Sequence, residues 1–230
     1  MVTLALQATF YLIIVRVLSL KGLGAYAAAG TLFTLLLPLL TWPVFGVGRY
    51  VIGYYQTGRL EEARGLYVRG LAMVLTASVA LAIVVWAFAL PLSSLYYGTT
   101  RYVWLLRLVA IDMVVYVYSN YVLSVAFPAS MRFGRWGLVQ ATWAFTRYGV
   151  ALALLFAGFG PAGLIAGWVA GDATSAALGT YWSLDLMLGG RARAPLLPAL
   201  IIAAPIAIGS FTASLLQNVD KLFVLRYIGL

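Results

Sequence analysis

The hydrophobic pattern of the chain is a series of long apolar stretches, separated by short segments rich in Arg, Gly or Pro. A helix that crosses a bilayer needs about 20 largely apolar residues. Seven stretches approach or exceed this length, which predicts an all-α, polytopic membrane protein. They span residues 1–18, 26–48, 66–90, 102–127, 138–156, 163–186 and 197–219.

Composition strengthens the membrane interpretation and narrows the chemistry. Hydrophobic residues make up 64% of the chain, charged residues 9%, and the mean hydropathy is +0.99, which excludes an ordinary soluble domain. The chain has no Cys and no His, so disulfides and Cys/His zinc sites are excluded. It has no phosphate-binding loop for ATP and few acids. We therefore expect no enzyme activity, no metal and no cofactor.

Basic residues alternate between the predicted loops, and this alternation predicts the orientation. Cytoplasmic loops of membrane proteins carry an excess of Lys and Arg. With the N-terminus in the cytoplasm, eight Arg lie on the inner side, against three basic residues outside, or five if Lys221 and Arg226 are included. The eight are Arg49, Arg59, Arg64, Arg69, Arg132, Arg135, Arg191 and Arg193. We therefore expect a multi-pass protein of the cell membrane. Its net charge of +9 indicates basic loops that lie against anionic membrane lipids, and not a nucleic-acid partner. Residues 54–69 read as a short amphipathic helix on the cytoplasmic surface.

A possible internal repeat bears on domain organisation. Residues 222–230 restate the pattern of residues 12–20, and Arg226 falls on Arg16. Apolar sequences also match by chance, so both explanations stay open. If the repeat is real, residues 1–190 form a six-helix N-terminal lobe. Residues 191–230 are then a cytoplasmic linker and the first helix of a truncated second lobe, as in transporters built from repeats.

Three ionisable residues lie near the middle of predicted membrane helices: Asp112, Arg147 and Asp172. Such groups are energetically costly in a bilayer, so they face protein or water and often mark a functional pathway. The three could form a shared site, with Arg147 pairing either carboxylate. They could instead form a buried salt-bridge cluster that only holds three helices together.

Further polar and small residues accompany this cluster. A polar stripe follows Asp112 along one side of its helix, made of Tyr116, Ser119 and Asn120. Such a stripe suits either a water-lined face or interhelical hydrogen bonds. Gly163, Gly167 and Gly171 recur every four residues, predicting a close helix contact that fixes Asp172. Trp143 lies four residues before Arg147, which suits a cation–π contact. The polar residues of 217–221 suit either an interfacial cap or the wall of a cavity.

Several loose motifs resemble a known transporter family. Residues 45–50, Phe-Gly-Val-Gly-Arg-Tyr, and residues 58–64, Gly-Arg-Leu-Glu-Glu-Ala-Arg, resemble the end of helix two and the following loop of polysaccharide and oligosaccharide flippases. Residues 16–26 resemble the exit from helix one, although Ser19 and Ala25 replace glycines. Residues 218–229 resemble the helix-seven signature. This family belongs to the multidrug/oligosaccharidyl-lipid/polysaccharide exporter superfamily. The resemblance covers the whole of this chain, which corresponds to the N-terminal half of a family member.

The resemblance implies two facing six-helix bundles that pass a lipid-linked oligosaccharide or polysaccharide precursor across the membrane by alternating access, driven by an ion gradient. Family members hold substrate phosphates with cavity arginines, for which Arg16, Arg49 and Arg147 are the candidates here. Asp112, Asp172 and Asp220 are candidates for ion coupling. At the midplane, two acids against one Arg depart from a clear anion site.

The chain is about half the length that such a transporter needs, so we expect it to require a missing C-terminal lobe or a second copy. Two alternatives remain. One is a cation-coupled multidrug exporter of the same superfamily. The other is a membrane-embedded glycosyl- or phosphotransferase, or a fragment that does not transport.

Overall fold

The structure is a computed structural model that describes residues 2–188 and 194–227, with side chains described for 3–188 and 194–221. It is all-α in this part of the chain, which confirms the predicted fold class. The helices are α1 (Val2–Val17), α2 (Leu20–Gln56), α3 (Leu60–Ala87), α4 (Ala89–Tyr97), η1 (Thr100–Tyr102), α5 (Val103–Tyr121), η2 (Val122–Ala126), α6 (Phe127–Ala129), α7 (Phe133–Leu154), η3 (Leu155–Phe159), α8 (Gly160–Trp182), α9 (Leu184–Met187) and α10 (Leu197–Tyr227).

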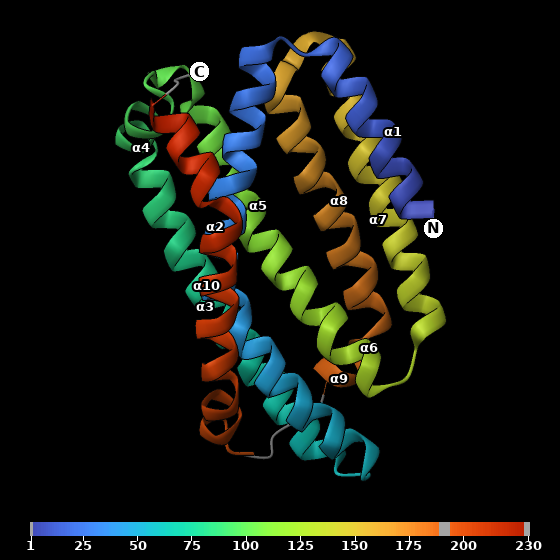
Figure 1. Ribbon diagram of the computed structural model, residues 1–230. Helices are drawn as coiled ribbons and strands as arrows, with labels where there is room; N and C mark the ends of the chain where they lie inside the picture. Colours follow the sequence, from blue (N-terminus) through green and yellow to red (C-terminus); the bar gives the residue numbers. More distant parts are fainter. Residues whose placement is uncertain (1, 189–193, 228–230) are drawn as a thin grey trace.

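Among the described residues, five helical stretches are long and apolar enough to cross a membrane, so the chain is a multi-pass membrane protein. One of them, Phe133–Trp182, reverses direction between the predicted stretches 138–156 and 163–186, where Gly158 and Gly160 adopt φ angles of 89° and 58°. A side chain is strained at such angles, which is why glycine occupies both positions. The helices α7 and α8 therefore form an antiparallel hairpin (Figure 1). The shorter helix α1 packs against α7.

The predicted amphipathic surface helix over residues 54–69 is wrong. Helix α2 continues to Gln56, through Pro38 and Pro43, and α3 begins at Leu60. The turn between them contains Gly58 with φ 77°. The polar residues of 54–69 belong to the ends of α2 and α3, two long helices that extend beyond the apolar core of a bilayer. The prediction took these two helix ends for one separate surface helix.

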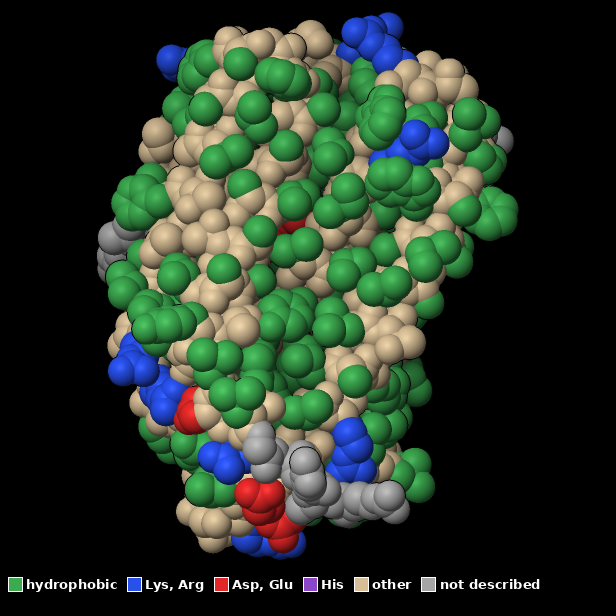
Figure 2. All heavy atoms as spheres, turned by 180° about the vertical axis from the view of Figure 1, so that it is seen from behind, with side chains coloured by type: hydrophobic (Ala, Val, Ile, Leu, Met, Phe, Trp, Pro, Cys, Tyr) green, Lys and Arg blue, Asp and Glu red, His purple; other side chains and the backbone are tan. Residues whose placement is uncertain are grey.

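Charged side chains gather toward the two ends of the bundle, while the face in Figure 2 is mostly hydrophobic between them. At the end where α2 meets α3, arginines join elements that are far apart in the sequence. Arg132 forms a two-bond ion pair with Asp185 (3.0 and 2.8 Å), and Arg64 donates to the Asp185 carbonyl at 2.9 Å. Arg69 donates to the carbonyl of Ala194, just before α10.

Helix α10 packs along α2, with its chain running in the opposite direction (Figure 1). The contact is close because Gly46 presents no side chain: a Cβ there would overlap the backbone of Ala199 and lie 2.9 Å from the Cβ of Ala203. Near the other end, Ser214 donates a hydrogen bond to the carbonyl of Thr34 at 2.7 Å. This contact makes α10 one wall of the cavity described next. Residues 189–193, with the predicted domain boundary and with Arg191 and Arg193, lie outside the described residues, as do the side chains of the 222–230 repeat.

Candidate functional site

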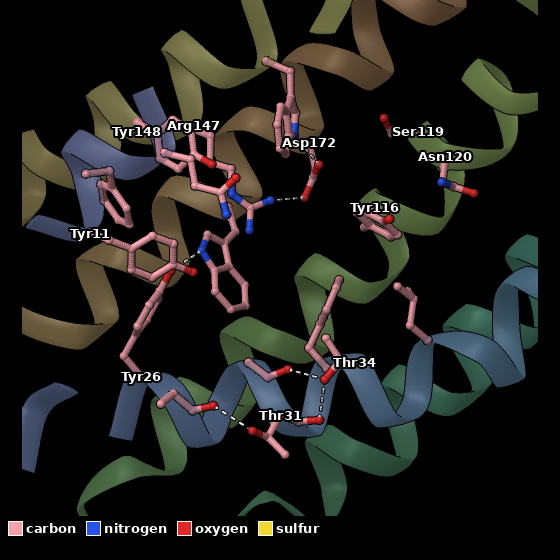
Figure 3. A pocket seen from close by; sticks show the side chains of 18 of the residues that line it. Tyr11, Tyr26, Thr31, Thr34, Tyr116, Ser119, Asn120, Arg147, Tyr148 and Asp172 are labelled. Carbon is pink, nitrogen blue, oxygen red and sulfur yellow. Dashed lines mark hydrogen bonds and ion pairs between the residues drawn. The ribbon is translucent and has the colours of Figure 1, made fainter. Parts of the chain in front are cut away.

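A cavity of about 750 Å³ lies between α1, α2, α5, α7, α8 and α10, and we call it the central cavity (Figure 3). Aromatic rings, hydroxyls and side-chain amides dominate its lining. They include Gln7, Tyr11, Tyr26, Thr31, Thr34, Tyr116, Ser119, Asn120, Gln140, Trp143, Tyr148, Trp168, Ser175, Gln217 and Asn218. Its charged lining residues are Arg147, Asp172 and Lys221, two cations and one acid.

Arg147 and Asp172 form an ion pair in the wall of this cavity, as one of the two predicted pairings requires. The Nη1 of Arg147 lies 3.6 Å from Oδ2 of Asp172, which is too long for a hydrogen bond. The other carboxylate oxygen, Oδ1, accepts a 2.7 Å hydrogen bond from Nε1 of Trp143. The Asp172 side chain is 2% exposed, while that of Arg147 is 17% exposed and faces the cavity.

The guanidinium of Arg147 lies between two indole rings. Its central carbon is 5.0 Å from the ring centroid of Trp143, confirming that predicted contact, and 4.9 Å from that of Trp168. Both rings are held in place, because Nε1 of Trp168 donates to the Tyr26 hydroxyl at 3.1 Å and Nε1 of Trp143 donates to Asp172. Within the described part of the chain, Arg147 donates no hydrogen bond. Its N–H groups therefore remain available to a ligand in the cavity.

The predicted glycine contact fixes the backbone that carries this pair. A Cβ at Gly167 would lie 2.5 Å from the Cβ of Ala151, and one at Gly171 would lie 2.6 Å from the Cβ of Arg147. Real Cβ atoms do not approach this closely, so only glycine permits the observed distance between α7 and α8. Asp172 follows Gly171 directly and is thereby placed beside Arg147.

Asp112 does not line the cavity. Its side chain is fully buried in α5, and neither carboxylate oxygen has a hydrogen-bond partner among the described residues. Its helix α5 packs against α8, the helix that carries Asp172. The predicted cluster is therefore an Arg147–Asp172 pair in the wall, with Asp112 behind it.

The polar stripe that follows Asp112 lines a cavity and also makes an interhelical hydrogen bond. Tyr116, Ser119 and Asn120 line the central cavity on α5, opposite Arg147 (Figure 3). Ser119 also donates an interhelical hydrogen bond to Ser175 at 2.8 Å. Tyr116 and Asn120, with Leu37, also line a second cavity of about 680 Å³, which we call the side cavity.

Arg49 lines this side cavity, together with Thr41 and Ser124. Because the two cavities share lining residues, a polar surface extends from Arg147 toward Arg49. Arg16 is exposed and lies outside the linings of both cavities. The cavity face of α1 carries Gln7, Phe10 and Tyr11, and Arg16 is nine residues from Gln7, about 180° around the helix.

Helix α10 adds a cation, Lys221, to the lining of the central cavity. The sequence left residues 217–221 as either an interfacial cap or the wall of a cavity, and the structure has Gln217, Asn218 and Lys221 in the wall. Ser214, Gln217, Asn218 and Lys221 line the central cavity, and the Lys221 ammonium donates to the Asn218 side chain at 3.0 Å. These four positions follow the i, i+3, i+4, i+7 spacing of one helix face. Asp220 does not fit this spacing, so the sequence pattern already places it on another face of the helix. Asp220 is exposed and lies outside both linings.

No protein-family model, curated protein or solved structure matches the chain. The functional argument therefore depends on the geometry of the cavities.

Proposed function

We propose that the chain is the cavity-forming lobe of a membrane transporter that flips a lipid-linked oligosaccharide or polysaccharide precursor by alternating access. The observation that carries the proposal is Arg147. Two fixed indole rings orient its guanidinium, and its N–H groups lack hydrogen-bond acceptors among the described residues. A planar guanidinium with free donors suits a phosphate, which it can bind through two parallel hydrogen bonds.

The charge balance of the cavities supports an anionic substrate. The sequence offered two midplane acids against one Arg, but Asp112 is buried behind the wall and Lys221 joins the lining. Two cations and one acid face the central cavity, and Arg49 lies in the side cavity that adjoins it. The surrounding rings, hydroxyls and amides suit the sugar part, since a few polar groups among aromatic rings can orient a ligand.

A cation-coupled multidrug exporter is the second candidate, and the two carboxyl groups favour it. Asp172 on α8 and Asp112 on α5 are both buried inside the bundle, and buried acids in membrane helices are frequent proton or cation sites. In the flippase proposal, the same pair serves ion coupling while Arg147 holds the substrate. The two functions differ in the charge of the substrate. Arg147 attracts the anionic substrate of a flippase and repels the cationic substrate of a multidrug exporter.

The orientation belongs to the same proposal, with the N-terminus in the cytoplasm of the cell membrane. The α2–α3 turn is then cytoplasmic, and the segment between α4 and α5 is external. Because the chain has no native Cys, single substitutions report the side directly. In intact cells, a membrane-impermeant thiol reagent should label Thr100→Cys and should leave Thr57→Cys unlabelled until the cells are opened. The reverse pattern would reject this orientation.

A second lobe is needed to close the cavity from the other side. We propose that this lobe is either a further part of the same polypeptide or a second copy of this chain. The intact mass of the native polypeptide from its source membrane separates the two. A mass near twice 24.8 kDa indicates one two-lobed polypeptide, while 24.8 kDa requires a dimer, to be sought by crosslinking.

Transport by the intact protein with Arg147→Gln tests the substrate role. We expect flipping of a fluorescent lipid-linked oligosaccharide in liposomes to fall about tenfold or more, because a charge-assisted hydrogen bond to phosphate is lost. Removing Arg147 also leaves Asp172 without its cation, so the double variant with Asp172→Asn is compared, and both are assayed for helicity and membrane insertion. Arg101→Gln is the control, since Arg101 is exposed and outside both linings.

Two results would count against the proposal. Unchanged flipping in Arg147→Gln would reduce Arg147 to a packing residue. Export of a cationic amphiphile that survives Arg147→Gln but is lost in Asp172→Asn would favour the multidrug exporter.

A further inference from the structure

A second arginine lies between two tryptophans, away from the central and side cavities. The guanidinium carbon of Arg107 on α5 is 4.9 Å from the ring centroid of Trp104 and 5.2 Å from that of Trp86 on α3. Arg107 lines neither cavity. The proposed transport site therefore does not account for this cluster, which we call the Arg107 cleft.

The charge of Arg107 has no counterpart in the described part of the protein. None of the ion pairs there includes it, and its buried Nε has no hydrogen-bond partner. Asp112 is five residues away on the same helix, about 140° around its axis, so it faces elsewhere. The cation–π contacts with two rings offset only part of the desolvation of a guanidinium inside a membrane. An anion is the missing partner.

The position of the cleft indicates where that anion comes from. Trp104 is the second residue of α5 and Trp86 is the last but one of α3, so both rings mark the same end of the bundle. Arg107 is four residues into α5, about 6 Å along its axis from the first residue. Its side chain points back toward the helix N-terminus, as helical side chains do, and so reaches the headgroup region. Tryptophans at this depth are typical of the membrane interface.

The cleft is open to lipid. The exposed fraction is 63% for Trp104 and 41% for Trp86, and both are large apolar side chains. A lipid can therefore lie against the rings with its acyl chains along α3 and α5 and its phosphate beside Arg107.

We propose that the Arg107 cleft is a binding site for the phosphodiester of an anionic phospholipid in the membrane leaflet at this end. Guanidinium and phosphate match through parallel, charge-assisted hydrogen bonds. An anionic headgroup such as phosphatidylglycerol neutralises the cleft. A zwitterionic headgroup carries its own ammonium, which competes with Arg107 for the phosphate. The site is separate from substrate transport and does not depend on it.

The test is lipid binding to the purified chain by native mass spectrometry, with phosphatidylglycerol and phosphatidylcholine titrated separately. We expect phosphatidylglycerol to bind the wild type more tightly than phosphatidylcholine. Arg107→Gln should weaken phosphatidylglycerol binding about tenfold or more, through loss of a charge-assisted hydrogen bond. This variant removes an uncompensated charge from a membrane helix, so we expect it to insert and fold. Arg101→Gln is the matched control, because Arg101 is an exposed arginine in η1, the turn just before α5.

Trp104→Leu provides an independent variant if Arg107→Gln loses helicity. It keeps the charge and removes one flank of the cleft, so binding should weaken less than in Arg107→Gln. The proposal is overturned if Arg107→Gln binds phosphatidylglycerol as the wild type does, or if Arg101→Gln weakens binding equally. It is also overturned if inorganic phosphate or glycerol phosphate displaces the lipid at equal concentration, because the cleft would then take free phosphate.

Discussion

At the residue scale, glycines and aromatic side chains fix the position of Arg147. Gly167 and Gly171 bring α8 against the backbone of α7, so Asp172 lies beside Arg147. Trp143 links the two, since its N–H bonds to Asp172 while its ring faces the guanidinium. Arg147 is thus oriented by ring faces and by a carboxylate at 3.6 Å, not by hydrogen bonds that would use its donors.

Gly171→Ala should disturb this arrangement without altering any charge. The new Cβ would lie 2.6 Å from the Cβ and 3.1 Å from the Cα of Arg147, so the helices must separate. Overpacking of this kind lowers the free energy of unfolding by about 1–3 kcal/mol, which denaturant titration in detergent micelles would measure. Gly149→Ala in α7 is the control, because a Cβ there meets nothing within 4 Å. If both variants were equally stable, the close contact would not matter for stability.

At the element scale, α10 is a wall of the cavity that packs mainly against one helix, α2. It is attached along α2 through Gly46, Ala199 and Ala203, and through the hydrogen bond from Ser214 to Thr34. Its polar face then turns Lys221 toward the central cavity, while exposed apolar residues such as Ile208 lie elsewhere on the helix. The placement of Lys221 depends on this attachment, because the contact of α10 with α2 is far more extensive than its contact with α4.

Gly46→Ala should loosen α10 from α2. The added Cβ would overlap the carbonyl oxygen of Ala199, and because backbone atoms cannot rotate away, one helix must shift. We expect faster hydrogen exchange in α10 than in the wild type, with α7 and α8 unchanged, as measured by mass spectrometry. Gly53→Ala is the matched change in α2, with open space around its Cβ. Equal exchange in the two variants would contradict the role of Gly46 in holding α10.

At the scale of the whole molecule, a polar cavity lies inside an apolar bundle. The charged ends and the hydrophobic face between them suit a bilayer, while the cavity brings hydroxyls, amides and Arg147 into the middle of the protein (Figures 2 and 3). The arginine contacts around Asp185 hold α9 to α3 and to the turn before α7 at one end of the bundle. A bundle built in this way can keep water inside the membrane region.

Cysteine labelling should distinguish this internal water from lipid. Thiol reagents attack the thiolate, which forms in water and not in hydrocarbon. Asn120 lines both cavities. The thiol of the Asn120→Cys variant should therefore react with a water-soluble maleimide on the order of tenfold faster than that of the Ile208→Cys variant. Ile208 is 70% exposed and outside both linings, so it faces lipid. Equal rates would mean that the central cavity is dry or that Ile208 is covered by water.

Many features of the candidate site could be predicted from the sequence. The features that could not be predicted depend on how each helix is rotated against its neighbours. The Gly163–Gly167–Gly171 spacing and the Trp143–Arg147 contact follow from residues four apart on one helix. The Arg147–Asp172 pairing follows from two opposite charges near the middle of two predicted membrane helices. The cavity role of Lys221 was visible as one of two alternatives. The positions of Arg16 and Asp220 outside the cavities follow from the rotation of α1 and α10 against their neighbours.

The sequence by itself determined that this is an all-α membrane protein and roughly where its long helices lie, because bilayer thickness fixes the length of an apolar stretch. Glycines at Gly158 and Gly160 marked the hairpin turn, since positive φ angles favour glycine. Only the tertiary structure decided that α2 reaches the turn at Gly58, that Asp112 is sealed behind the wall, and that Lys221 joins Arg147 in one cavity. Depth in the membrane is a local property of the chain, whereas the direction in which a side chain faces is set by all the helices packed around it.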